Sequence, residues 1–288
     1  SFHTKIDRIV GFINPNMPRT TGDAELAYSS LAGVCDYDFP LKTIVEKSTD
    51  EAAVSIANNI VCLIPDGVTV QVGIGQIPRQ VLARLGSHRG LRIHSGVVDD
   101  NILELEESGA LDPDEPIVTG TAVGSSRLYQ SLNNNTRFAF RSVAFTHDHR
   151  VISSVDRFFA VNSVLQVDLL GQATAESSGG RWIASPGGLP DFVRGALSSL
   201  GGQSIIAVRA RGNGSSSFGI TPLLQAPHAV TSTAADADVI VTEYGAAHLR
   251  NLSLDKRAEA IVAIAAPDQQ QKLLDEWAEL RATGLRGR

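Results

Sequence analysis

The sequence predicts an α/β protein in which a mainly parallel sheet is flanked by helices. Two observations carry this prediction: short β-branched runs alternate with stretches whose apolar residues recur at helical spacing, and glycine-containing loops connect them. With 288 residues, 43% of them hydrophobic, the chain has enough apolar material for a large core. In folds of this class, functional loops lie at the carboxyl ends of the strands.

Residues 1–48 are predicted to be an amino-terminal linker and the remnant of a preceding domain. Ile6 to Ile13 reads as a strand, and the run from Asn14 to Thr20 contains two prolines that break it into a loop. We place the main α/β domain at residues 49–288.

The main domain is expected to begin with a helix, a strand and a second helix. Apolar residues recur at helical spacing between Asp50 and Ile64, and Pro65 to Gly67 then turns the chain. Val68 to Val72 is a short β-branched run, and a glycine loop leads from it into the next helical pattern. Further strands are predicted at Leu91–His94, Ser204–Val208 and Val239–Thr242, and further helices at Ile102–Leu105, Asp191–Leu200 and Leu254–Ala265, with a stop at Ala266-Pro267-Asp268.

Composition excludes several classes of function. A net charge of -6 without a run of lysines or arginines argues against nucleic acid and anionic membranes as partners, and favours a small molecule or a protein. The apolar stretches fall short of the roughly 20 residues of a membrane span, and no charged-then-apolar leader is seen. Only Cys35 and Cys62 are present, and no Cys/His cluster has metal-ligand spacing. We expect a reduced, cytoplasmic protein without a structural metal.

Five blocks of sequence carry a family resemblance. They are Val70–Pro78, Ile93–Ser95, Asn162–Gln172, Gly187–Ala196 and Val241–Gly245. In this order they resemble the acetyl-CoA hydrolase/CoA-transferase family, which includes 4-hydroxybutyrate CoA-transferase and succinyl-CoA:acetate CoA-transferase. A single glycine loop would be weak support, but the resemblance contains all five blocks in order and runs from Asn14 to about Leu274, nearly the whole chain. The resemblance implies the carboxy-terminal, CoA-transferase-like (NagB/RpiA-like) half of such an enzyme.

The resemblance also implies partners and substrates. Family members are usually longer, with a similar α/β half ahead of this region and the active site between the halves. We therefore expect a homo-oligomer or a hetero-oligomer with an α/β subunit. An acyl-CoA and a carboxylate are the implied small-molecule partners, with the coenzyme A ester as substrate and no permanently bound cofactor.

The family's chemistry depends on a glutamate that this chain lacks. In a CoA-transferase that carboxylate attacks the acyl-CoA thioester, and an anhydride and then a glutamyl-CoA thioester carry the group to a second carboxylate. Where family members have His-Ser-Glu or Tyr-Thr-Glu, this chain has His94-Ser95-Gly96. The position of the nucleophile thus falls on Gly96, predicted to follow the strand that ends at His94.

Other residues near this position are candidates for activating water. They are Asp99, Asp100 and His94. The two aspartates have a solvated or helix-capping role as the alternative, and His94 a hydrogen-bonded role in a buried strand. His147 stands where the family tends to have asparagine before an aspartate, and loop packing is its alternative.

Two glycine loops and two arginines complete the predicted site. Gly187 and Gly188 are candidates for an oxyanion-holding loop, because glycine lets backbone N–H groups approach a substrate. Residues of the first loop are predicted to contact CoA, a tight strand-to-helix turn being the alternative; they are Gly73, Ile74, Gly75 and Gln76. Arg209 and Arg211 are predicted to pair CoA phosphates, unless they are simply exposed to solvent.

The sequence leaves three functions open. The first is acyl-CoA hydrolysis or acyl transfer without the glutamyl-CoA intermediate. The second is a non-catalytic partner subunit of a hetero-oligomeric enzyme of this type. The third is an enzyme repurposed to a non-CoA substrate, which the altered region at 209–217 would permit.

Overall fold

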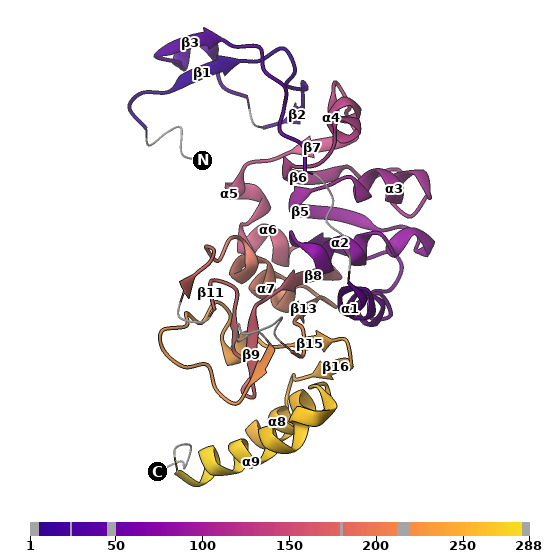
Figure 1. Ribbon diagram of the computed structural model, residues 1–288. Coiled ribbons are helices and arrows are strands. Elements are labelled where there is room, and N and C mark those ends of the chain that lie inside the picture. Colours follow the sequence, from indigo (N-terminus) through magenta and orange to yellow (C-terminus); the bar gives the residue numbers. More distant parts are fainter. Residues whose placement is uncertain (1–5, 24, 45–49, 179–180, 212–218, 284–288) are drawn as a thin grey trace.

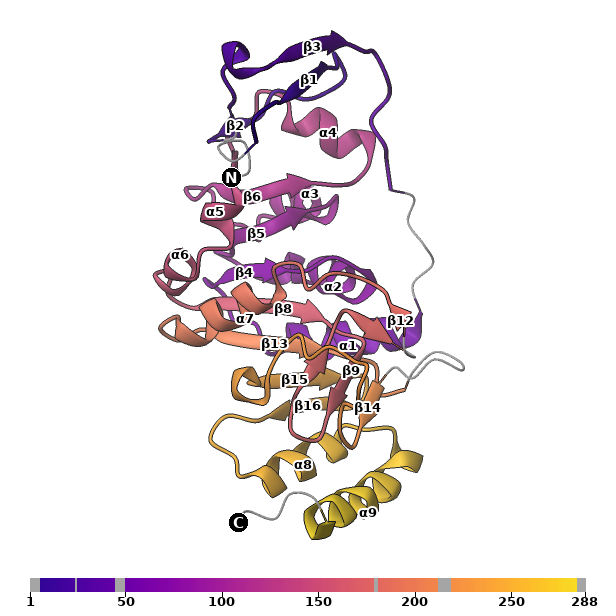
Figure 2. The same ribbon diagram turned by 90° about the vertical axis from the view of Figure 1, so that its left-hand side faces the viewer.

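The computed structural model describes residues 6–23, 25–44, 50–178, 181–211 and 219–283. A sheet of nine strands forms the centre of the protein, and Figure 1 shows how helices surround it. Its strand order is β16-β15-β13-β8-β4-β5-β6-β7-β2. All neighbouring pairs are parallel except β15 with β16. The predicted α/β class with a mainly parallel sheet is confirmed. Figure 2 shows the strands stacked above one another, with β1 and β3 at one end of the molecule and α8 and α9 at the other.

The elements have the following bounds. The sheet contains β2 (Thr21–Gly22), β4 (Thr69–Val72), β5 (Arg92–Val98), β6 (Ile117–Ala122), β7 (Phe138–Phe140), β8 (Phe158–Ser163), β13 (Gln203–Ala207), β15 (Val239–Thr242) and β16 (Gly245–His248). The helices are α1 (Glu51–Val61), α2 (Gln76–Leu82), α3 (Asn101–Glu107), α4 (Ser126–Leu132), α5 (Val143–Thr146), α6 (His149–Ser153), α7 (Leu189–Ser198), α8 (Leu254–Ala263) and α9 (Pro267–Thr283). Smaller sheets pair β1 (Val10–Ile13) with β3 (Gly33–Asp36), β9 (Gln166–Asp168) with β10 (Ala173–Thr174) and β14 (Gly219–Thr221), and β11 (Ser177–Ser178) with β12 (Arg181–Trp182).

The central strands are buried and mainly apolar, as expected for a parallel sheet covered by helices on both faces. All residues of β4 and β15 are buried, and β8 and β13 each have one residue that is only partly buried. Continuous apolar runs were therefore the right signal for these strands. The first predicted helix is α1, whose amino-terminal cap is Asp50: the side chain accepts a hydrogen bond from the Ala53 N–H at 2.9 Å. In the described part of the chain, no helix combines the length and apolar character that crossing a membrane requires.

The segment before α1 is partly built into the main sheet. β2 pairs with β7 and forms one edge strand, whereas β1 and β3 pair only with each other. Several apolar side chains here are more than half exposed: Val10 and Phe12 on β1, and Tyr37 just after β3. The boundary predicted at residues 48 and 49 lies outside the described residues, and the division into domains stays a prediction.

The predicted stop at Ala266-Pro267-Asp268 is confirmed, because α8 ends at Ala263 ahead of it. What the sequence did not indicate is that Pro267 begins a further helix, α9. Proline is tolerated at the first position of a helix, where its missing N–H would have no partner in the helix and its fixed φ suits the turn.

Asp168, in the third family block, ties the loop after β9 to the loop after β14. Its buried carboxylate accepts hydrogen bonds from the backbone N–H groups of Leu170, Gln172 and Leu224 at 3.0, 2.9 and 3.1 Å. The Gln172 side chain donates a fourth at 2.7 Å. Burial raises the pKa of Asp168 above its ordinary value, against the opposing effect of these donors.

We expect Asp168→Asn to destabilise the protein without touching the pocket described below. The substitution places an NH₂ group where one oxygen accepted from Leu224 and the Gln172 side chain. Leaving two buried donors without an acceptor predicts a loss of about 2–6 kcal/mol in the free energy of unfolding. Urea unfolding measures it, with the exposed Asp114→Asn as control. Equal stability of the two variants would contradict a role for Asp168 in joining the loops.

Candidate active site

A pocket of about 460 Å³ lies toward the carboxyl ends of three neighbouring strands, β8, β4 and β5. This is where the α/β fold places functional sites. The pocket brings together parts of both glycine loops and position 96. Its lining residues are Gln71, Val72, Gly73, Ile74, Ser95, Gly96, Val97, Val123, His147, Asn162, Ser163, Ala175, Ala184, Ser185, Pro186, Gly187, Gly188, Leu189 and Phe192.

Gly96 lies inside β5 and not in a loop after it. The expectation of a strand that ends at His94 was wrong, because the backbone of β5 pairs with β6 as far as Val98. The Ser95 hydroxyl donates to the carbonyl of Val72, the last residue of β4, at 3.2 Å. Gly96 follows Ser95 and so lies just beyond the end of β4, where it forms part of the pocket wall.

The His147 ring occupies the space beside two of the glycines. A Cβ atom added to Gly96 would lie 2.8 Å from Cε1 and 3.0 Å from Nε2 of the ring, and one added to Gly188 would lie 2.3 Å from Nε2. The ring also packs on Phe192, with 4.7 Å between centroids. Loop packing was the alternative for His147 on sequence grounds, and the structure instead gives it a place in the pocket wall.

The chain around His147 is held by short helices. Its N–H donates to the Val143 carbonyl at 3.0 Å at the end of α5, and Asp148 caps the start of α6. Its Nδ1 lies 2.8 Å from Oγ1 of Thr146. Burial lowers the pKa of His147 below its ordinary value, and the charge of Asp191 opposes this shift. The imidazole is therefore mainly neutral at pH 7.

His94 is a buried, hydrogen-bonded residue of a strand, which was the alternative to a catalytic role. Its side chain is buried under Phe145 and Phe158, with ring centroids 5.8 and 5.6 Å away. Its Nε2 donates to the Thr146 carbonyl at 2.9 Å. Burial lowers the pKa of His94, so the ring stays neutral. His94 does not line the pocket, and it positions the turn that carries His147.

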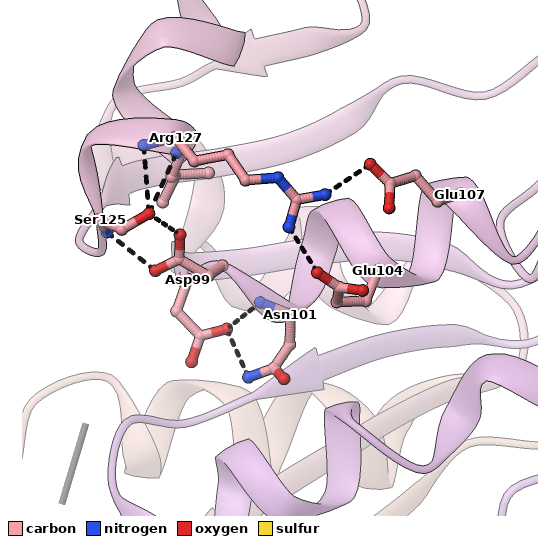
Figure 3. Close-up of polar contacts among 8 residues, drawn as sticks. Asp99, Asn101, Glu104, Glu107, Ser125 and Arg127 are labelled. Carbon is pink, nitrogen blue, oxygen red and sulfur yellow. Dashed lines mark hydrogen bonds and ion pairs between the residues drawn. The ribbon is translucent and has the colours of Figure 1, made fainter. Parts of the chain in front are cut away.

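The two aspartates after β5 are both engaged, and neither lines the main pocket. Asp99 accepts from the N–H and the side chain of Asn101 at 3.1 and 3.0 Å (Figure 3) and lies 3.4 Å from Arg79. Asp100 accepts from the backbone N–H and the hydroxyl of Ser125. Its carboxylate thus fastens the start of α4 to the end of β5.

A smaller pocket of about 130 Å³ adjoins the main one. The two share Val72, Gly73, Ile74, Val97 and Val123 as walls. The smaller pocket adds further apolar side chains together with the Arg79–Asp99 pair; these are Ile44, Leu82 and Val98. Asp99 is thus next to the site without facing position 96.

The second glycine loop leads into α7 at the edge of the main pocket. Gly187 has φ +58°, a conformation that favours glycine, and a Cβ atom there would meet nothing within 4 Å. Gly188 caps α7, and its missing Cβ makes room for His147. The loop therefore has open space beside Gly187 and a close contact with His147 at Gly188.

The first glycine loop divides between the pocket and α2. Gly73 and Ile74 line the pocket, and a Cβ on Gly73 would lie 3.0 Å from Oδ1 of Asn162. Gly75, with φ +121°, is the amino-terminal cap of α2, and Gln76 is the first residue of that helix. Gly75 and Gln76 do not line the pocket. They form the strand-to-helix turn that was the alternative interpretation of this loop.

The two predicted phosphate-binding arginines are engaged in ion pairs away from the pocket. Arg209 pairs with Asp50 through two contacts of 2.8 Å and donates to the Gln76 side chain at 3.0 Å. Hydrogen bonding by Arg209 lowers the pKa of Asp50. Arg211 pairs with Asp268. Residues 212–218, which include most of the altered region, lie outside the described residues, so CoA-phosphate binding by these arginines stays a prediction.

Sequence reasoning missed several residues of the pocket. Gln71 and Asn162 exchange hydrogen bonds of 3.3 and 3.0 Å across β4 and β8, and Ser163 and Phe192 line the pocket beside them. The end of β8 could have been found, because Asn162 begins a family block and directly follows a run of apolar residues. Phe192 also lies inside a family block, but an aromatic residue in a helix is usually part of the core, so its place in the pocket wall was not indicated. Within the described residues, no group of three or more His, Cys, Asp or Glu side chains is arranged to hold a metal ion.

Comparison with known proteins gives consistent matches. The family model of the acetyl-CoA hydrolase/transferase C-terminal domain matches residues 124–277. The chain is 36% identical over 276 residues to the 4-hydroxybutyrate coenzyme A transferase of Clostridium kluyveri, covering 93% of this chain and 64% of that protein.

Two solved structures have the same fold over most of this chain. RipA from Yersinia pestis superposes with a TM-score of 0.90 at 30% identity, covering 97% of this chain and 65% of that one. The 4-hydroxybutyrate CoA-transferase of Porphyromonas gingivalis superposes with a TM-score of 0.82 at 32% identity, covering 94% and 66%. The chain thus spans less than two thirds of the length of each of these three proteins. It belongs to the acetyl-CoA hydrolase/transferase family.

Proposed function

We propose that this chain binds an acyl-CoA thioester in the main pocket and hydrolyses it, or transfers its acyl group, without a glutamyl-CoA intermediate. One observation carries the proposal: among the described residues that line the pocket there is no aspartate or glutamate, and position 96 is glycine. The covalent route needs an enzyme carboxylate at the thioester. Attack by water needs only a base, so hydrolysis is the reaction that this pocket supports best.

The second glycine loop supplies the electrostatic part of the proposal. Gly187 and Gly188 precede the amino-terminal end of α7, which is the positive end of the helix dipole and carries Asp191 in its first turn. A thioester carbonyl held at this loop would develop its negative charge near that end. Backbone donors of this kind stabilise an oxyanion without having to reorganise.

The substrate is divided between the two pockets in this proposal. The thioester lies in the main pocket beside Gly96, and the acyl group enters the apolar adjoining pocket that Ile74 and Val97 share with it. The coenzyme A ester is the substrate, and no permanently bound cofactor is invoked. A carboxylate acceptor stays the alternative to water.

A partner completes the site in this proposal. The exposed apolar side chains of β1, with Tyr37 just after β3, support it, because exposed apolar faces of this kind are normally covered by a partner or by self-association. We propose a homo-oligomer or a hetero-oligomer with a second α/β unit, in a cytoplasmic setting. Multi-angle light scattering that shows a stable monomer at micromolar concentration would argue against it.

The experiment is an acyl-CoA binding titration followed by a hydrolysis assay on the purified chain. Release of the CoA thiol from acetyl-CoA or butyryl-CoA, at a rate independent of added acetate, is the expected result. Binding without turnover would favour a non-catalytic subunit. Absence of both would favour a substrate that is not a CoA ester, or a site that needs its partner.

A further inference from the structure

We infer that His147 is the general base that activates water for attack on the thioester, an inference that rests on the proposed hydrolysis. His147 lines the pocket beside Gly96, the position at which the sequence resemblance places the family's glutamate. The other candidate bases are bonded elsewhere: His94 to the Thr146 carbonyl, Asp99 to Asn101 and Arg79, and Asp100 to Ser125. His147 is thus the titratable side chain in the described wall of this pocket.

The hydrogen bonds around His147 determine which nitrogen is basic. The Thr146 hydroxyl lies 3.3 Å from the Ser142 carbonyl and 2.8 Å from Nδ1 of His147. A carbonyl only accepts, so both contacts are satisfied only when the hydroxyl donates to Ser142 and Nδ1–H donates to the hydroxyl. The lone pair is then on Nε2. The Thr146 side chain plays the orienting role that a base requires from a neighbouring group.

Nε2 points to the place where the reaction would occur. Cβ atoms built on Gly96 and Gly188 would lie 3.0 and 2.3 Å from it, so it sits between the two backbone segments that approach the thioester. No hydrogen bond engages Nε2 within the described part of the chain. Phe192 packs against the ring, and the His94 bond to the Thr146 carbonyl fixes the turn. The base is therefore held in place before substrate binds.

The chemical step balances without any further reactant. A water oxygen forms a bond to the thioester carbonyl carbon while its proton passes to Nε2 of His147. The oxyanion then collapses, the C–S bond breaks, and the leaving thiolate takes the proton from the imidazolium. One water is consumed, one carboxylic acid and one CoA thiol are released, and the acid loses its proton to solvent. No covalent bond to the enzyme forms at any stage.

A pH profile distinguishes this role from packing. The groups around the ring are His94 on β5, Asp191 in the first turn of α7, and Asp148, which pairs with Arg150 at 3.0 Å. The base must be neutral, so kcat/KM should fall as the pH drops through the pKa of His147 and be flat above it. Because burial lowers that pKa, the acidic limb should lie below about 6.5, the ordinary value for histidine.

The test compares three variants of the full chain by acetyl-CoA hydrolysis, thermal unfolding and affinity for a non-hydrolysable thioether analogue of acetyl-CoA. His147→Gln keeps a polar group near Nε2 but cannot take up a proton. His147→Asn keeps a group at the level of Nδ1 and removes Nε2. His149→Ala is the matched control, because His149 is exposed and bonded to Ser198 at 3.1 Å.

We expect both His147 variants to lose about 100- to 10,000-fold in kcat, the usual contribution of a general base. They should keep their affinity for the analogue within a few-fold and lose the acidic limb, while His149→Ala keeps the wild-type rate and profile. A folded His147→Gln that retains the rate or the limb would overturn the inference and leave hydrolysis standing. A wild-type chain that binds the thioether analogue but does not hydrolyse acetyl-CoA would overturn the proposed function and this inference with it.

Discussion

Gly188→Ala is expected to abolish hydrolysis although it adds only one methyl group. The added Cβ would lie 2.3 Å from Cδ2 and Nε2 of His147 and 2.9 Å from Phe192, so the imidazole must move. A displaced base loses most of its contribution, about 100-fold or more in rate. The crowding also costs about 1–3 kcal/mol of stability. Hydrolysis assays and urea unfolding on the same preparation measure both effects.

Gly195→Ala is the matched control on the same helix. Its added Cβ would also lie 2.3 Å from a neighbour, in this case Cγ2 of Ile152, and it does not line the pocket. We expect a similar loss of stability with turnover per folded molecule retained. If the two variants lose activity in proportion to their stability, position 188 has only a packing role.

The second large effect concerns covalent chemistry at position 96. The wild-type chain, incubated with acyl-CoA and then borohydride or hydroxylamine, should show no modified acidic residue. The described wall of the main pocket contains no acid, and Asp99 in the adjoining pocket is bonded to Asn101 and paired with Arg79. Gly96→Glu alone should also fail, since its Cβ would lie 2.8 Å from the His147 ring. His147→Asn removes Cε1 and Nε2, the two ring atoms that this Cβ would meet. The double variant Gly96→Glu, His147→Asn is therefore expected to gain a trappable adduct.

Peptide mass mapping decides between the outcomes. A CoA thioester or its reduction product on any wild-type carboxylate would contradict the water-based route. An adduct in Gly96→Glu with His147 intact would show that the ring moves aside at little cost. The variant His147→Asn without the glutamate is the control, and it should show neither an adduct nor rapid hydrolysis.

Parts of the fold could be read from sequence because local pattern and burial agree there. Val239 to Thr242 is both β-branched and fully buried, so its bounds as a strand are correct. The sequence predicts too short a strand for β5 because Gly96 is a poor strand residue, and only the pairing of its neighbours Ser95 and Val97 with β6 continues the strand past it. The edge strand β2 has two residues and joins the sheet through β7, so no local pattern indicates it.

The difference between local sequence patterns and long-range contacts also explains which parts of the site could be predicted. Strand ends and glycine loops are local features, so Gly73, Gly96 and the second glycine loop could be predicted to lie near one pocket. The sequence marks His147 only by its position relative to the family pattern. Its contact with Gly96 arises only when α5 and α6 fold against β5. The ion pairs of Arg209 and Arg211 could not be predicted for the same reason. Their partners, Asp50 and Asp268, are far away in the sequence.

The two edge strands of the main sheet, β2 and β16, help to explain how the protein avoids aggregation. An open sheet has two outer strands whose unpaired N–H and C=O groups can recruit another chain. β2 offers only two residues at one side, too few to template a stable new strand. At the opposite side, β16 runs antiparallel to β15, and α8 packs against it. A long, accessible outer strand is thus avoided at both sides of this nine-stranded sheet.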